Sequence, residues 1–283
     1  MLETVRIGDL EFDVRMTGPD DGTPVVLLHG FPETSRSWTG VAEQLAADGM
    51  RVIAPDQRGY SPGARPVGAH EYDIKELVAD VIGLLDALGL ESVHLAGHDW
   101  GASVAWAMAA WHPDRVRSLV AVSVPHPASL TWAIDNDPDQ QRRSDYITLF
   151  RDPGKAEKTL LKLNAAAFRA LFGTHIAKES VDEYLAHLSE PGALLAALNW
   201  YRAMTREFGE IPAVTVPTTY LWSTKDPALG EVAARHCEKF VSGDYRLIVL
   251  DGVSHWVPEE APAEVVAAIR SRVAEVPPNT LLG

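Results

Sequence analysis

The chain has 283 residues, with 25 Lys or Arg against 39 Asp or Glu, so its formal net charge at pH 7 is −14. This charge repels phosphate backbones and anionic bilayers, and no basic cluster offsets it, so neither nucleic acid nor a membrane is an expected partner. The single cysteine, Cys237, excludes an internal disulfide and is expected to be a buried, small apolar residue.

The N-terminal residues carry acids where a secretory signal would have a basic start and an apolar run. No stretch offers the ~20 apolar residues that a bilayer crossing needs. Together with the single cysteine, these observations predict a cytoplasmic protein.

Short apolar runs alternate with longer amphipathic stretches in the first half of the chain. Residues 5–7 and 11–16 are predicted to form an antiparallel hairpin that turns at Gly8-Asp9. Continuous apolar runs at 25–28, 51–54, 92–96 and 116–124 predict buried parallel strands. Helices are predicted between them, at 38–48, 74–88 and 101–112. This alternation is typical of an α/β fold.

The strand pattern stops after Val124, and residues 126–212 are helical in pattern and charged. Strands return at 218–222 and 245–250, and a closing helix is predicted at 263–273. We therefore predict an α/β core made of residues 1–125 and 213–283, with 126–212 inserted as a helical lid. Loops at the carboxyl ends of parallel strands carry function, so a lid there would cover a site. Residues 277–283 are expected to form a loose terminus.

The most informative motif joins the strand at 92–96 to the following helix. It reads Gly97-His-Asp-Trp-Gly101, a strand-to-helix turn that pushes its central side chain out above the sheet. A serine usually occupies the place of Asp99. A carboxylate is already a nucleophile near neutral pH and suits displacement at an sp³ carbon, which leaves an ester on the protein. The neighbouring His98 is expected to make hydrogen bonds away from the reacting atoms.

Three further segments complete a catalytic set around Asp99. The backbone amides of Phe31, in His29-Gly-Phe-Pro32, and of Trp100 are predicted to form an oxyanion hole, and both residues are predicted to contact substrate. Asp226 follows one late strand and His255 follows the next. Nucleophile, acid and histidine thus occur in the order expected for this architecture.

These motifs, with Asp56-Gln-Arg-Gly-Tyr60, resemble the α/β-hydrolase superfamily, and within it the epoxide hydrolases, over nearly the whole chain. Two lid segments, 145–154 and 198–202, look like lid motifs of epoxide hydrolases. In that family each motif contributes a tyrosine whose hydroxyl hydrogen-bonds the epoxide oxygen, and Tyr146 and Tyr201 match those positions. The resemblance implies an α/β-hydrolase fold with a mostly parallel sheet, a small-molecule epoxide substrate, a vicinal diol product and no metal or organic cofactor.

A phenol suits this chemistry on independent grounds. Opening an epoxide expels an alkoxide, and a neutral donor with a pKa near ~10 transfers a proton as the C–O bond breaks. Tyr184, on a neighbouring lid helix, is instead expected to be a core residue. Arg58 and Asp56 are expected to form an ion pair beneath the site. Trp38, Trp132 and Trp256 are candidates either for lining the cleft or for packing.

Two other functions are weighed against epoxide hydrolysis. A haloalkane or haloacid dehalogenase can use the same Asp99, but haloalkane dehalogenases resemble one another in having asparagine where this chain has Phe31. A haloacetate substrate would need arginines just beyond Asp99, and no arginine occurs between Asp99 and Arg115. The third possibility is a catalytically silent ligand-binding protein, because a fold alone never proves catalysis. A homodimer is left open.

Overall fold

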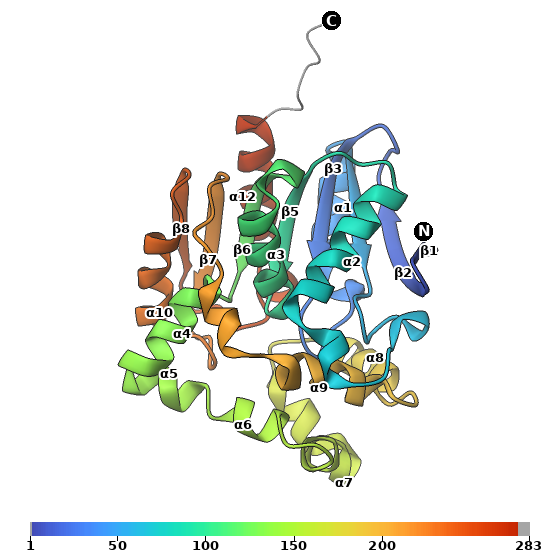
Figure 1. Cartoon of the computed structure of the whole chain (residues 1–283), viewed down its shortest axis with the longest axis vertical. Coiled ribbons are helices and arrows are strands. Elements are labelled where there is room, and N and C mark those ends of the chain that lie inside the picture. Colours follow the sequence, from blue (N-terminus) through green and yellow to red (C-terminus); the bar gives the residue numbers. More distant parts are fainter. Residues whose placement is uncertain (1, 277–283) are drawn as a thin grey trace, which may run out of the picture.

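A computed structural model describes residues 2–276 and contains an eight-stranded sheet. The strand order is β1-β2-β4-β3-β5-β6-β7-β8 (Figure 1). β2 runs antiparallel to β1 and β4, and the other neighbouring pairs are parallel. The bounds are β1 Leu2–Ile7, β2 Leu10–Thr17, β3 Thr23–Leu28, β4 Met50–Pro55, β5 Val93–His98, β6 Val116–Val122, β7 Thr218–Ser223 and β8 Tyr245–Leu250.

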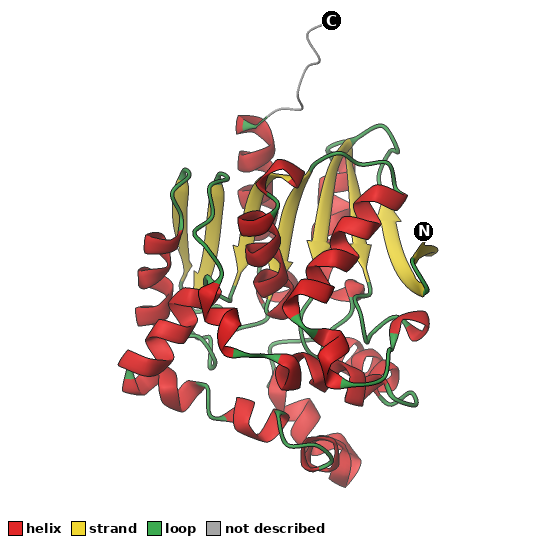
Figure 2. Cartoon of the chain, viewed as in Figure 1, coloured by secondary structure: helices red, strands yellow, loops and turns green. Residues whose placement is uncertain are grey.

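Helices cover both faces of this sheet. α2 (Ile74–Ala87) and α3 (Trp100–Trp111) pack against each other on one face, and α1 (Thr39–Ala47) and α12 (Pro262–Glu275) do so on the other (Figure 2). Side chains of β3 alternate between the two cores. A strand buried on both faces must be apolar at every position, which explains the continuous apolar runs. The predicted α/β fold class is confirmed.

Six α-helices follow β6 in the chain and precede β7. Figure 1 shows them gathered at the carboxyl ends of the parallel strands. α7 is interrupted at residues 162–165, where the backbone leaves the helical conformation. Their bounds are α4 Pro127–Asn136, α5 Pro138–Arg143, α6 Tyr146–Phe150, α7 Lys155–Phe172, α8 Lys178–Leu188 and α9 Ala193–Ala203.

Shorter helices occupy the loops of the fold. The α-helices among them are α10 Glu231–His236 and α11 Val257–Glu260. The 3₁₀ helices are η1 Ser35–Trp38, η2 Pro62–Ala64, η3 Ala69–Tyr72, η4 Pro113–Arg115, η5 Arg206–Glu210 and η6 Cys237–Phe240.

The predicted strands and helices lie within a few residues of the observed ones, and one difference has a local cause. The strand predicted to reach Val124 ends at Val122, because Ser123 takes a positive φ of 67° that an extended strand does not allow. Cys237 and Tyr184 are buried, as expected. The prediction of a loose terminus at 277–283 lies outside the described residues.

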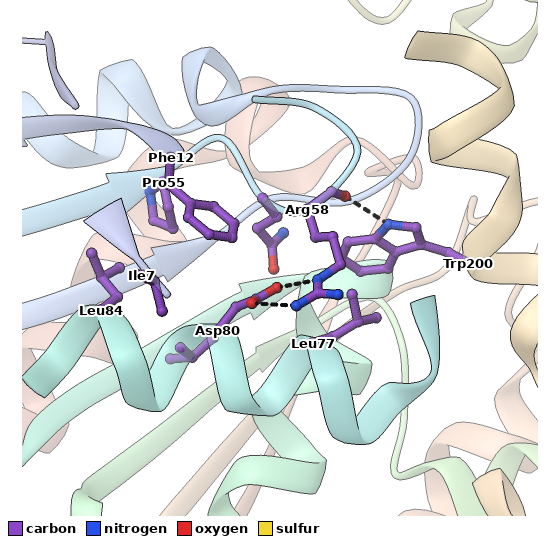
Figure 3. A pocket seen from close by; sticks show the side chains of 10 residues that line it. Ile7, Phe12, Pro55, Arg58, Leu77, Asp80, Leu84 and Trp200 are labelled. Carbon is purple, nitrogen blue, oxygen red and sulfur yellow. Dashed lines mark hydrogen bonds and ion pairs between the residues drawn. The ribbon is translucent and has the colours of Figure 1, made fainter. Parts of the chain in front are cut away.

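The expected ion pair between Arg58 and Asp56 is wrong. Arg58 donates from Nε and Nη2 to the two carboxylate oxygens of Asp80, on α2, at 2.6 and 2.7 Å (Figure 3). Asp56 instead accepts a hydrogen bond from the Ser35 amide at 2.7 Å. Both carboxylate oxygens of Asp80 accept from the guanidinium of Arg58. This bidentate geometry is stronger than a bond to a single oxygen, which explains the choice of partner.

The backbone of Arg58 also contacts α9. The indole Nε1 of Trp200, on α9, donates to the carbonyl of Arg58 at 2.9 Å (Figure 3). Arg58 is therefore held by Asp80 on one side and holds Trp200 on the other. The contact sets the position of α9 above the sheet, and with it the position of the next residue, Tyr201.

Candidate active site

Asp99 lies at the turn between β5 and α3 in a strained backbone conformation, with φ 52° and ψ −121°. A non-glycine residue rarely adopts a positive φ. The turn is also too tight for side chains at its ends, since a Cβ added to Gly97 would collide with the carbonyl of Gly101 and one added to Gly101 with that of Leu28. The two glycines of the motif thus let the chain turn sharply and raise the Asp99 carboxylate above the sheet.

Asp99 is 7% exposed, and its carboxylate has three polar neighbours. The Phe31 amide donates to Oδ1 at 2.8 Å, and the Trp100 amide also hydrogen-bonds the carboxylate. Oδ2 lies 3.5 Å from Nε2 of His255. Burial disfavours the charged form, but the hydrogen bond and charge of His255 outweigh it and hold the pKa of Asp99 below its ordinary value. Asp99 is therefore ionised at neutral pH.

His255 lies between two carboxylates. Its Nδ1 donates to Oδ2 of Asp226 at 2.7 Å, and its Nε2 faces Asp99. Burial lowers the pKa of His255, but the charge and hydrogen bond of Asp226, followed by those of Asp99, raise it well above the usual value. Loss of the negative charge on Asp99 would remove part of this stabilisation and favour the neutral, basic imidazole.

Asp226 is fixed by its other oxygen, Oδ1, which accepts hydrogen bonds from the amides of Ala228 at 2.8 Å and Leu229 at 3.0 Å. The carbonyl of His255 accepts hydrogen bonds from the hydroxyl of Ser123 at 2.8 Å and from Nε2 of His98 at 2.9 Å. Hydrogen bonds thus fix the carboxylate of Asp226 and the backbone of His255. His98 makes hydrogen bonds away from the reacting atoms, as expected.

Tyr146 and Tyr201 come from α6 and α9 and line one cavity with Asp99 and His255. The cavity has a volume of about 310 Å³. Burial, followed by the charge of Asp99, raises the pKa of both tyrosines above the ordinary value, so both phenols keep their protons. The lining residues are Phe31, Pro32, Asp99, Arg143, Tyr146, Phe150, Ala170, Leu171, Tyr201, Pro227, Ala228, His255 and Trp256.

A second, smaller cavity of about 40 Å³ shares Asp99, Tyr146 and Tyr201 with the first. The three side chains therefore lie between a large space and a small one. Aromatic packing holds this arrangement, since the ring of Phe31 lies 5.4 Å from that of Tyr201 and 5.2 Å from that of Phe150, in centroid distance.

The structure brings every predicted site residue together: Asp99, His255, Asp226, Tyr146, Tyr201, Phe31 and Trp100 lie around these two cavities or hydrogen-bond a residue that lines them. Of the three tryptophan candidates, Trp256 lines the larger cavity. Trp38 is buried in the core under α1, and Trp132 stacks on His236 at the surface. The sequence did not single out Arg143, which lines the cavity although its surroundings form no motif.

Residues 2–276 contain no group of three or more His, Cys, Asp or Glu that could hold a metal ion. The helices described in that range also include none that is long and apolar enough to span a membrane.

Comparison with known proteins identifies the family. Residues 23–262 match the family described as alpha/beta hydrolase fold. Epoxide hydrolase A of Mycobacterium tuberculosis is 34% identical over 88% of this chain and 90% of its own length. The AB hydrolase superfamily protein YfhM of Bacillus subtilis is 35% identical over 92% of this chain and 93% of its own.

Solved structures agree with the sequence comparison. The crystal structure of epoxide hydrolase A from Mycobacterium thermoresistibile superposes with a TM-score of 0.86 at 31% identity, covering 97% of this chain and 98% of that one. The chain therefore belongs to the epoxide hydrolase family of the α/β-hydrolase fold.

Proposed function

We propose that this protein hydrolyses a small-molecule epoxide to a vicinal diol through a covalent ester on Asp99. One observation carries the proposal: two protonated phenols and an ionised carboxylate line the same cavity. A carboxylate can attack an oxirane carbon, and a phenol can protonate the oxygen that leaves.

The first half-reaction forms the ester. Asp99 attacks a carbon of the oxirane, the C–O bond breaks, and Tyr146 or Tyr201 gives its proton to the departing oxygen. The product is a β-hydroxyalkyl ester of Asp99. Burial keeps both phenols neutral until the alkoxide develops, so a proton is available at the moment that the bond breaks.

The second half-reaction hydrolyses the ester. Esterified Asp99 has no charge, so one of the carboxylates that hold a proton on His255 is lost. Neutral His255, oriented by Asp226, removes a proton from water, which attacks the ester carbonyl and not the alkyl carbon. The amides of Phe31 and Trp100, already directed at the carboxylate, stabilise the tetrahedral oxyanion by about 3 kcal/mol for each donor. The tetrahedral intermediate collapses, the departing alkoxide takes the proton held by His255, and the proton of the added hydroxyl returns to the tyrosinate. The diol leaves with Asp99 ionised and both phenols protonated again.

Residues 126–212 form the lid in this account. They supply both tyrosines, and they exclude bulk water from a cavity whose floor is the core of residues 1–125 and 213–283. The reaction needs no metal or organic cofactor. A cytoplasmic location is part of the proposal because the chain has a single, buried cysteine.

Turnover of styrene oxide tests the proposed function. We expect the purified protein to form phenylethanediol, detected by chromatography, and to release no chloride from 1-chlorobutane. Chloride release without diol formation would assign the protein to the dehalogenases. No turnover and no covalent labelling with either compound would favour a silent ligand-binding protein.

A further inference from the structure

Two carboxyl groups meet inside the protein, away from both site cavities. Glu33, in the loop after β3, is fully buried, and its Oε2 lies 2.9 Å from Nδ1 of His98. Its Oε1 is also buried, and within residues 2–276 it accepts from no N–H group or hydroxyl. The carboxyl group of Glu259, on α11, lies within hydrogen-bond reach of Glu33. Two buried carboxyl groups this close cannot both be ionised at low cost, so the pair holds one proton.

α8 contacts this carboxyl pair from among the helices inserted after β6. The buried hydroxyl of Tyr184 donates to Oε2 of Glu259 at 3.1 Å. Ser180, four residues earlier on the same face of α8, also hydrogen-bonds Glu259. The ring of Phe172 stacks on those of Tyr184 and Trp256, at centroid distances of 5.7 and 4.4 Å. Because Trp256 lines the larger site cavity, the position of α8 affects one wall of that cavity.

A separate cavity gives Glu259 access to solvent. It has a volume of about 230 Å³, and Glu259, which is partly exposed, lies in its wall. None of its lining residues belongs to the cavity that contains Asp99 and His255. Glu259 can therefore exchange a proton with water without passing through the active site. The lining residues are Arg36, Ser37, Thr39, Gly40, Ser180, Pro258, Glu259 and Pro262.

Other charged groups on the same elements are paired with one another. Arg36, on η1, makes an ion pair with Glu183 of α8 at 2.8 Å. His175, between α7 and α8, lies 3.6 Å from Glu260 of α11. No lysine or arginine within residues 2–276 forms an ion pair with either member of the carboxyl pair. A proton is thus what neutralises the second carboxyl group.

The proton makes the contact of α8 depend on pH. Burial, followed by the charge of Glu33, raises the pKa of Glu259 from its ordinary value of 4.5 to about 8. With α8 moved away, Glu259 would lie in water and regain its ordinary pKa, so between these two values the closed arrangement binds one proton more than the open one. Closure is therefore favoured most below this range. As the pH rises through the range, the equilibrium constant for opening grows by up to about tenfold per pH unit.

We propose that Glu259 is a proton-dependent latch that holds α8 against the core. Protonated Glu259 donates to Glu33 and accepts from Tyr184, whereas ionised Glu259 repels Glu33 and releases the helix. Release would loosen the aromatic stack behind the cavity wall, so that ligands enter and leave more easily. At neutral pH the latch is mostly closed. It uses none of the reacting atoms, so the inference does not depend on the proposed function.

Hydrogen–deuterium exchange of the whole protein, followed by mass spectrometry at several pH values, tests the latch. After correction for intrinsic exchange, protection of α8 should fall by roughly 10- to 100-fold between pH 6 and pH 8, while protection of α3 stays constant. Glu259→Gln should keep α8 protected throughout, because its amide can donate to Glu33 and accept from Tyr184 at every pH. Glu179→Gln is the matched control, since this exposed carboxylate on α8 should not affect the latch.

Two results of the exchange experiment would overturn the inference. One is protection of α8 that does not change with pH in the unmodified protein. The other is a fall that persists in Glu259→Gln, which would assign the pH dependence to His175 and Glu260.

Infrared spectroscopy of the unmodified protein detects the shared proton directly and needs no variant. The C=O band of a protonated carboxyl group should be present at pH 7 and should disappear with a midpoint near pH 8. Lack of this band at pH 7 would contradict the latch. Neither measurement involves turnover, so each outcome is distinct from success or failure of diol formation.

Discussion

Replacing His255 with glutamine is expected to trap the protein as an ester of Asp99. The attacking carboxylate needs no base, whereas the hydrolytic water does, so the first half-reaction should continue and the second should stop. The Phe31 amide, 2.8 Å from Asp99 Oδ1, remains in place to hold the carboxylate for attack. Intact-protein mass spectrometry after mixing with styrene oxide should show the mass of one substrate added, and peptide mapping should place it on Asp99.

The matched control is the double variant His255→Gln with Asp99→Asn, which should gain no mass. A single variant His255→Gln that has lost turnover and yet stays unmodified would contradict the two-step assignment. A circular dichroism spectrum like that of the unmodified protein shows that the variant has folded, so that a missing adduct reports on chemistry.

Replacing both Tyr146 and Tyr201 with phenylalanine is expected to nearly abolish formation of the ester. Loss of one positioned general acid, as in Tyr201→Phe, typically slows a step by roughly 10²- to 10⁴-fold, and the loss is smaller where a second acid remains. Both phenols line the cavity with Asp99, so either can serve in the absence of the other. Hydrolysis of an ester already formed should change much less, since that step uses His255 and backbone amides. Stopped-flow tryptophan fluorescence can resolve the two steps, because the Trp100 ring lies 5.2 Å from that of Tyr201 in centroid distance.

Tyr184→Phe is the control for this pair, because Tyr184 is buried on α8 and hydrogen-bonds Glu259 at 3.1 Å outside the cavity. It should leave the rate of ester formation almost unchanged. Ester formation at the normal rate in the double variant would remove the reason for preferring epoxides and would favour a dehalogenase.

Much of the candidate site could be predicted because its residues follow strands. In a parallel sheet the carboxyl ends of the strands meet at one edge, so Asp99, Asp226 and His255 converge although they are far apart in the chain. The glycines on either side of Asp99 predicted the tight turn for a local steric reason, which the contacts of Gly97 and Gly101 bear out. Local patterns of this kind can be recognised without knowledge of the packing.

Features that depend on packing between distant segments could not be predicted in this way. Arg58 pairs with Asp80 and not with Asp56, because the choice depends on which carboxylate α2 turns toward the loop. Arg143 lies in a segment whose charges look like those of any exposed helix end, and it reaches the cavity only because α5 packs over Asp226. Trp38 and Trp256 were both candidates for lining the cleft, yet one lies in the core and the other lines the cavity.

The origin of the oxygen in the first diol tests the central claim, which is that Asp99 attacks the epoxide and water then attacks Asp99. In a single turnover in ¹⁸O-labelled water, with the protein in excess over styrene oxide, we expect the diol to take its new oxygen from the unlabelled carboxylate. The label should then be found in Asp99, in the peptide that contains this residue. Labelled diol with an unlabelled Asp99 would mean that water attacks the epoxide directly, and would contradict the account.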